Sequence, residues 1–154
     1  MRVLISGAGI AGPTLAWFLA ETPAHITVLE KSSGLRSEGH NIDIDGSAIT
    51  IINKMGILDE IKRLNTTEIG TRILASDGKP IATFPFSKGS SIDPTSEYEI
   101  LRGDLANILY EASKSRPNVE YMFGTTVEEV LRNDQELVKD RKSTRLNSSH
   151  QYYL

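Results

Sequence analysis

A strand–turn–helix–strand pattern at the start of the chain most constrains what this sequence can fold into. The apolar run 3–5 predicts a short buried strand, and a Gly-x-Gly-x-x-Gly motif at Gly7, Gly9 and Gly12 follows it. Leu15, Phe18 and Leu19 then recur at helical spacing, so we expect a helix that opens at the glycines and has these residues on its apolar face. Residues 26–29 predict a second strand. The alternation of strand and helix indicates an α/β protein.

Each glycine has a physical role in such a unit. Gly7 permits the tight turn out of the strand, Gly9 lets a pyrophosphate approach the backbone, and Gly12 lets helix and strand pack closely. The helix N-terminus offers N–H groups and the positive end of its dipole to the phosphates. Glu30, 18 residues after Gly12, can accept hydrogen bonds from both hydroxyls of an adenosine ribose.

An acid at this position disfavours a 2′-phosphate, so the expected nucleotide is FAD or NAD rather than NADP. The alternative is a glycine-rich turn in some other α/β protein, with Glu30 merely solvated at a strand end.

Composition excludes several functional classes. At 154 residues one domain is the default, and a net charge of −3 gives no reason to expect nucleic acid or an anionic membrane as partner. The chain has no cysteine, its three histidines are scattered, and no apolar run could span a bilayer, so neither thiolate chemistry nor a metal site is expected. A strand that starts at Arg2 leaves no room for a leader peptide, so we expect a cytoplasmic protein.

The remaining pattern is a mixture of short elements. We expect a helix capped by Ser47 and ending at Gly56, a short helix over 57–64, and a hairpin of strands 68–74 and 81–84 with its turn at Asp77–Gly78. Further expected elements are a loop at 88–94, a strand at 97–101, a helix from Arg102, strands at 119–123 and 125–131, a turn at 133–135 and the start of a strand at 136.

Six segments carry a resemblance to a known family: 7–16 (GAGIAGPTLA), 28–31 (VLEK), 41–44 (NIDI), 55–59 (MGILD), 99–105 (EILRGDL) and 123–127 (FGTTV). They resemble the N-terminal part of group A FAD-dependent monooxygenases of the aromatic-hydroxylase type, and are similar to fungal members that act on secondary metabolites. The resemblance covers about residues 1–139. It implies an incomplete Rossmann-like FAD-binding domain, with residues 68–100 contributing part of an antiparallel substrate-domain sheet.

The resemblance also implies a set of cofactor-binding residues, whereas no catalytic residue can be named. In the family the glycines hold the FAD pyrophosphate, the acid holds the ribose, and an arginine at a helix start reaches the FAD. Carried over, the set is Gly7, Gly9, Ile10, Ala11, Gly12, Glu30, Lys31, Asp43 and Arg102. The plain alternatives are a surface charge at Arg102, which is unfavourable at a helix start, and a solvated turn residue at Asp43.

The function so implied is that of an NAD(P)H-dependent flavoprotein monooxygenase with FAD as cofactor and NADPH as co-substrate. It would insert one oxygen atom of O2 into an aromatic or polyketide-like substrate, and the present chain alone is expected to be inactive. The alternatives are another FAD- or NAD-dependent oxidoreductase and a non-catalytic nucleotide-binding module. The long excursion 31–67 disfavours a simple NAD dehydrogenase, which would continue with another βαβ crossover.

The stretch from Asp140 to His150 has no hydrophobic period. It resembles the codon-for-codon translation of a common DNA sequencing adapter. We therefore expect native sequence to end at about Lys139 and residues 140–154 to form a non-native, disordered tail.

Overall fold

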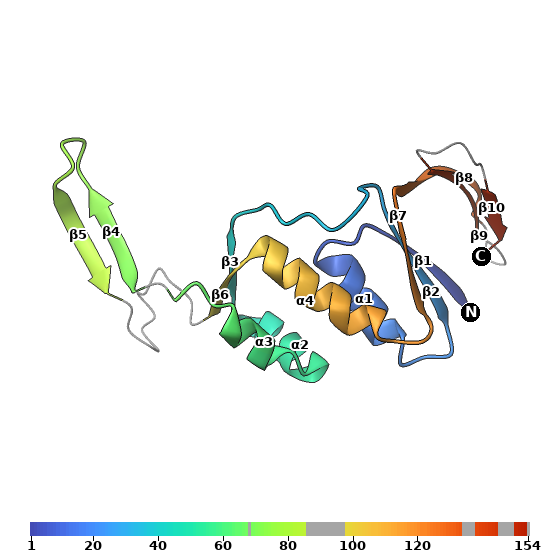
Figure 1. Ribbon diagram of the computed structural model, residues 1–154, viewed down its shortest axis with the longest axis horizontal. Helices are drawn as coiled ribbons and strands as arrows, with labels where there is room; N and C mark the ends of the chain where they lie inside the picture. Colours follow the sequence, from blue (N-terminus) through green and yellow to red (C-terminus); the bar gives the residue numbers. More distant parts are fainter. Residues whose placement is uncertain (68, 86–97, 134–137, 145–149, 154) are drawn as a thin grey trace. The chain divides into compact units, whose positions relative to one another are not determined.

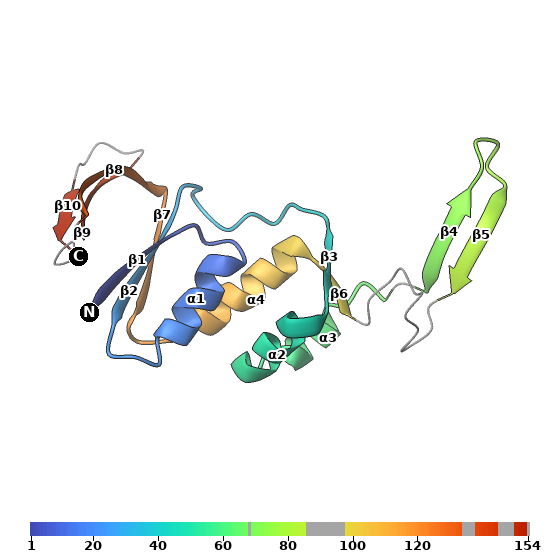
Figure 2. The ribbon, with the colours of Figure 1, turned by 180° about the vertical axis from the view of Figure 1, so that it is seen from behind.

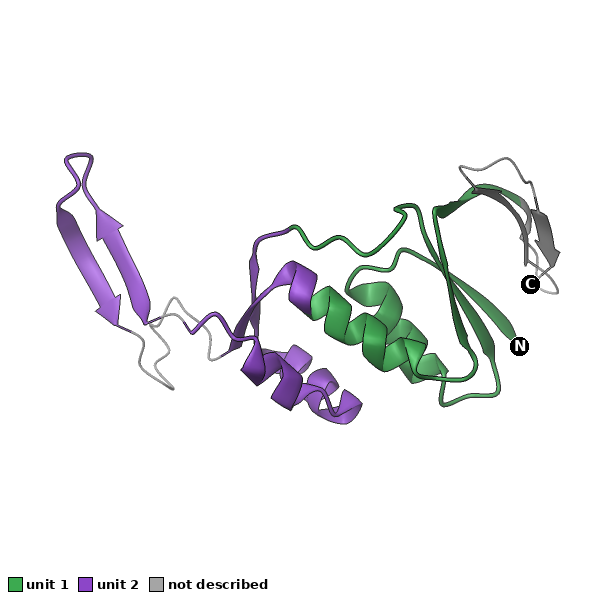
Figure 3. Ribbon diagram, viewed as in Figure 1, with its two compact units in different colours: residues 1–38, 105–154 green, residues 39–104 purple. Residues whose placement is uncertain are grey.

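The computed structural model divides the chain into two compact units, one of residues 1–38 and 105–154 and the other of residues 39–104 (Figure 3). It describes residues 1–67, 69–85, 98–133, 138–144 and 150–153.

The first unit is built on a parallel sheet whose strand order is β1–β2–β7. A second sheet, antiparallel and ordered β10–β9–β8, follows it along the chain. The elements, shown in Figure 1, are β1 (Arg2–Ser6), α1 (Ala11–Leu19), β2 (His25–Glu30), most of α4 (Arg102–Lys114), β7 (Val119–Phe123), β8 (Thr125–Asn133), β9 (Val138–Thr144) and β10 (His150–Tyr153).

Strand register gives the parallel sheet one strongly apolar face. Ile5, Val28 and Tyr121 stand in one row across the three strands, and α1 packs against this side. From α4, Tyr110 meets Tyr121 with ring centroids 4.7 Å apart, and the buried Ser113 hydroxyl is 2.6 Å from the Tyr121 hydroxyl. Both helices therefore lie on the same side of the sheet, as Figures 1 and 2 show from opposite directions.

Helix α1 faces the sheet with its smallest residues. Ala16 is fully buried and Gly12 is buried, whereas Leu15 is 50% exposed. The predicted helix is confirmed, but Leu15 of its predicted apolar face does not reach the core. Small residues at the contact let the helix backbone approach the strands closely, which leaves no room for a leucine there.

The second unit contains two antiparallel strand pairs and two helices. Its elements are β3 (Asn41–Ile44), α2 (Gly46–Met55), α3 (Leu58–Arg63), β4 (Gly70–Leu74), β5 (Pro80–Pro85) and β6 (Tyr98–Leu101), with the first residues of α4. β3 pairs with β6, and β4 with β5. The buried side chains come from both helices, from the link between them and from the β3–β6 pair, namely Ile44, Ile52, Met55, Ile57, Ile61 and Ile100.

Most expected elements of this unit are confirmed, including the 77–78 hairpin turn and the stop at Gly56, whose φ of +71° suits a glycine cap. The prediction that Ser47 is the N-cap of α2 was wrong. The helix begins at Gly46 after an extended Asp45, whose carbonyl accepts the Ala48 N–H, so Ser47 already lies within the first turn. The expected loop at 88–94, residues Glu68 and Glu97, and most of the 133–135 turn lie outside the described residues.

The C-terminal segment, for which a non-native, disordered tail stays the prediction, contains two described strands. Residues 138–144 form β9 and residues 150–153 form β10, in an antiparallel ladder that continues from β8. A ladder uses main-chain groups common to all residues, so it can form without the hydrophobic period that this segment lacks.

Candidate functional site

The turn between β1 and α1 has the geometry that its glycines predict. Gly7 has φ +104°, a conformation that side chains disfavour, and its N–H donates to the Leu29 carbonyl at 2.6 Å. A Cβ on Gly12 would overlap the carbonyl oxygen of Gly7 and lie 3.4 Å from Cγ2 of Ile5. The tight turn at Gly7 and the close packing at Gly12 are thus confirmed, while the role of Gly9 stays a prediction.

The Glu30 carboxylate lies against this turn. Its Oε2 accepts the Ala8 N–H at 2.9 Å, and its Oε1 accepts the Ser32 N–H at 2.9 Å. Partial burial raises the pKa of Glu30, but backbone hydrogen bonds from Ala8 and then Ser32 outweigh it, so the pKa lies below its ordinary value. Each carboxylate oxygen can accept a further hydrogen bond, so the carboxylate can bind a hydroxyl-bearing ligand while it holds the turn.

The N-terminus of α1 is not capped by a side chain of its own. Ile10 occupies the cap position without a side-chain hydrogen bond, no acid lies in the first turn, and Pro13 carries no N–H. The first N–H groups of a helix have no intrahelical acceptor and lie at the positive end of its dipole. This helix end therefore suits an anionic ligand such as a phosphate.

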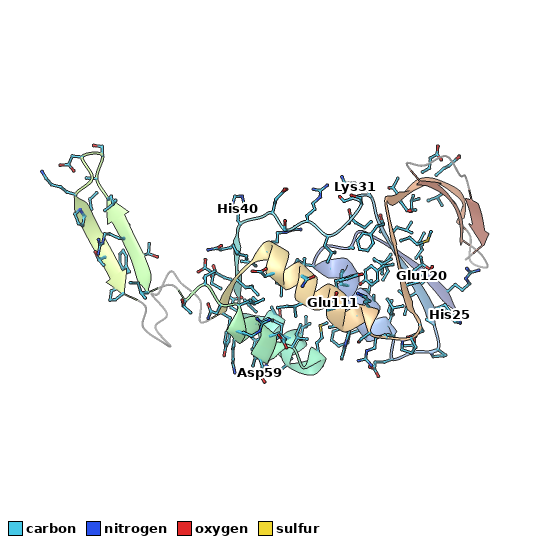
Figure 4. The ribbon with its side chains drawn as sticks, in the orientation of Figure 1. His25, Lys31, His40, Asp59, Glu111 and Glu120 are labelled. Carbon is cyan, nitrogen blue, oxygen red and sulfur yellow. The ribbon has the colours of Figure 1, made fainter. Side chains whose placement is uncertain are left out.

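The remaining predicted residues divide between the two units. Lys31 is exposed directly after β2, in the same unit as the glycine turn (Figure 4). Asp43 is exposed on β3, opposite Glu99 of β6. Arg102, also exposed, begins α4. The structure brings the glycine turn and Glu30 together, and places Asp43 within the β3–β6 pair and Arg102 directly after β6.

Sequence reasoning missed three residues, two that bind Glu30 in the first unit and one beside Arg102 in the second. Ala8 and Ser32 bind Glu30 through their backbone N–H groups, which every residue except proline carries, so no side-chain pattern could reveal them. Gly39 lies in the polar segment after Lys31, and its φ of +150° brings it against Arg102. A lone glycine in a polar loop gives no sign of such a contact.

We expect low pH to reduce the stabilisation that the Glu30 carboxylate gives to the glycine turn. Because the folded-state pKa is lowered, the ionised carboxylate stabilises the fold above its ordinary pKa of 4.5, and this stabilisation is lost as pH falls through the folded-state value. Urea unfolding across this pH range should show a decline that is smaller in Glu30→Gln, which has no carboxyl group to titrate. Equal declines in both proteins would contradict this account.

The site defines a dinucleotide-binding α/β protein. It has a parallel sheet, a glycine turn between the first strand and a helix, and an acid at the end of the neighbouring strand. The sequence matches the family described as FAD binding domain over residues 1–151. The chain belongs to this family.

Its curated relatives include fungal proteins. The chain is 37% identical over 136 residues to the flavin-dependent monooxygenase eupH of Phoma sp, covering 87% of this chain and 32% of the relative. It is 40% identical over 131 residues to the FAD-dependent monooxygenase asL4 of Sarocladium schorii, covering 83% of this chain and 30% of the relative. The chain thus spans about a third of the length of these relatives.

Solved structures share the fold. The tetracycline destructase Tet(51) is 28% identical with a TM-score of 0.74, over 98% of this chain and 36% of that protein. The flavin-dependent monooxygenase PieE, solved with FAD and substrate, has a TM-score of 0.81 at 18% identity, over 99% of this chain and 29% of that protein. The second likeness concerns the fold alone.

In the described part of the chain, no helix is long and apolar enough to cross a membrane, and no cluster of acidic and histidine side chains could hold a metal ion.

Proposed function

We propose that this chain is the FAD-binding part of an NAD(P)H-dependent flavoprotein monooxygenase that inserts one oxygen atom of O2 into an organic substrate. The observation that carries the proposal is the Glu30 carboxylate held at the glycine turn, in a chain of the FAD binding domain family. The relatives named as monooxygenases support the reaction class. The proposal includes an aromatic or polyketide-like substrate.

The residues of the first unit fit the adenosine diphosphate portion of FAD. The uncapped N–H groups at the start of α1, after Gly9, Ile10 and Ala11, would bind the pyrophosphate. Glu30 would accept the ribose hydroxyls on the lone pairs that Ala8 and Ser32 leave free. Lys31 would add positive charge near this end of the nucleotide.

In the second unit, Arg102 would supply fixed, permanently charged donors to FAD, and Asp43 would lie near the flavin or substrate. FAD, when bound, supplies the redox and oxygen chemistry, and NADPH would supply the electrons. The protein holds the cofactor and orients it.

Titration of FAD into the 154-residue chain, followed by flavin fluorescence, tests the proposal. We expect saturable but weak binding, with the flavin lost on gel filtration. NAD should compete poorly, because the proposed site also holds the flavin half through Arg102. Tighter binding of NAD than FAD would favour a different oxidoreductase, and the absence of saturable FAD binding would contradict the proposal. FAD retained at a 1:1 ratio through gel filtration would show that the expected weakness is wrong.

A further inference from the structure

Gly39 and Arg102 are in close contact although they lie far apart in the sequence. A Cβ built on Gly39 would lie 2.9 Å from Cβ of Arg102, 3.2 Å from its Cδ and 3.5 Å from its Cγ. The first two distances are shorter than ordinary carbon–carbon contacts. The aliphatic part of the Arg102 side chain therefore lies on the space that a side chain at position 39 would occupy.

The backbone fixes this contact from both sides. β3 and β6 pair antiparallel up to the Asn41–Leu101 pair, and beyond it the Arg102 N–H donates to the His40 carbonyl at 3.1 Å. His40, labelled in Figure 4, thus joins Gly39 to the ladder. Because the ladder sets the separation of the two backbones, neither residue can move away alone when a side chain is added.

The guanidinium of Arg102 is open to a ligand. The residue is exposed, and among the described residues no carboxylate forms an ion pair with it. An arginine side chain has many rotamers, so its affinity for a ligand depends on how many of them the protein excludes. The contact with Gly39 restricts the stem and leaves the charged end free.

We propose that Gly39 is a positioning residue for Arg102: its missing side chain lets the arginine stem lie along the backbone, which directs the guanidinium toward FAD. The inference rests on the proposed function, because it takes FAD as the ligand of Arg102. It adds a residue that acts through another and does not itself touch the cofactor.

Backbone strain and the side-chain contact must be separated in the test. At φ +150° any L-residue at position 39 is strained, so Gly39→Ala loses stability for that reason alone. Gly56→Ala is the control for a positive φ without a contact, since Gly56 has φ +71° in the same unit, with nothing within 4 Å of its added Cβ. The strain of φ +150° is itself controlled by the Arg102→Gly background, which leaves it unchanged. Both variants should lose stability, and only Gly39→Ala should disturb Arg102.

The first measurement is the χ1 rotamer of Arg102 by NMR couplings in the FAD-free chain. We expect one dominant rotamer in the unaltered chain and in Gly56→Ala, and a mixture in Gly39→Ala. The second is a double-mutant cycle on the Kd for FAD with Arg102→Gly, which removes all three contacting atoms. Arg102→Gly should raise Kd about tenfold, as loss of a charged hydrogen bond does. Gly39→Ala should raise Kd several-fold alone and less than about twofold in the Arg102→Gly background.

The possible results separate the inference from the proposed function. If Gly39→Ala raises Kd equally in both backgrounds, or leaves the Arg102 rotamer unchanged, the inference is overturned while FAD binding stands. If the unaltered chain does not bind FAD, or Arg102→Gly leaves Kd unchanged, FAD is not the ligand of Arg102 and both fall. If Gly39→Ala does not fold, the χ1 populations of Arg102 in the unaltered chain decide: one dominant rotamer supports the inference, and a mixture overturns it.

Discussion

Replacing Gly12 with alanine is expected to destabilise the first unit severely and to abolish FAD binding. The added Cβ would overlap the carbonyl oxygen of Gly7, and Gly7 cannot retreat because its N–H is bonded to the Leu29 carbonyl. A clash with backbone costs about 3 kcal/mol or more, a large share of the roughly 5–15 kcal/mol that holds a domain folded. Urea unfolding followed by fluorescence of Trp17, the single tryptophan, measures the loss directly.

Gly34→Ala is the matched control for this variant. Gly34 lies in the same unit, has no positive φ, and has nothing within 4 Å of an added Cβ. Its unfolding free energy should stay within about 0.5 kcal/mol of the unaltered chain. An unchanged urea midpoint for Gly12→Ala would mean that α1 can move away from β1 at little cost, against the packing described here.

Glu30→Gln should raise the Kd for FAD by about 10- to 100-fold. The glutamine amide keeps one acceptor oxygen and replaces the other by an NH2 group, which cannot accept an N–H from Ala8 or Ser32 or a ribose hydroxyl. Loss of hydrogen bonds to a charged group costs about 1.5–3 kcal/mol, which corresponds to this change in Kd. The measurement is the same fluorescence titration, with the fold checked by circular dichroism.

Glu120→Gln serves as the matched control, because Glu120 is an exposed acid on the neighbouring strand β7, in register with Thr27 rather than with the strand end (Figure 4). It removes the same charge and should leave Kd within about twofold. Equal Kd values for Glu30→Gln and the unaltered chain would show that the carboxylate does not contact the nucleotide.

The strand–glycine turn–helix–strand unit could be predicted from sequence because each step has a local cause. Three glycines and an apolar run specify the turn and the packing, and the binding of a ribose by the terminal acid stays a prediction. The strand pairs were harder. β7 pairs with β2 although the whole second unit lies between them in the sequence, and β3 pairs with the distant β6. Local periodicity predicts that each strand exists but does not predict its partner.

What the sequence could not supply depends on backbone angles and main-chain donors. The amino-acid sequence does not show that Gly39 has φ +150°, or that the Ser32 N–H donates to Glu30. Leu15 fits a helical period, yet Ala16 is the residue that reaches the core. The strands β9 and β10 arise from main-chain pairing in a segment without hydrophobic alternation, where a pattern of side chains gives no signal.

The bond between the Arg102 N–H and the His40 carbonyl places the two ends of the second unit side by side. The second unit is thus an insertion whose last residues lie next to its first residues. Once it has folded, the closure of β7 onto β2 involves only residues 31–39 and 103–118 instead of the whole stretch 31–118, which lowers the entropy cost of that closure. Length changes within the insertion, such as in the β4–β5 hairpin, can therefore accumulate during evolution without altering the nucleotide-binding turn.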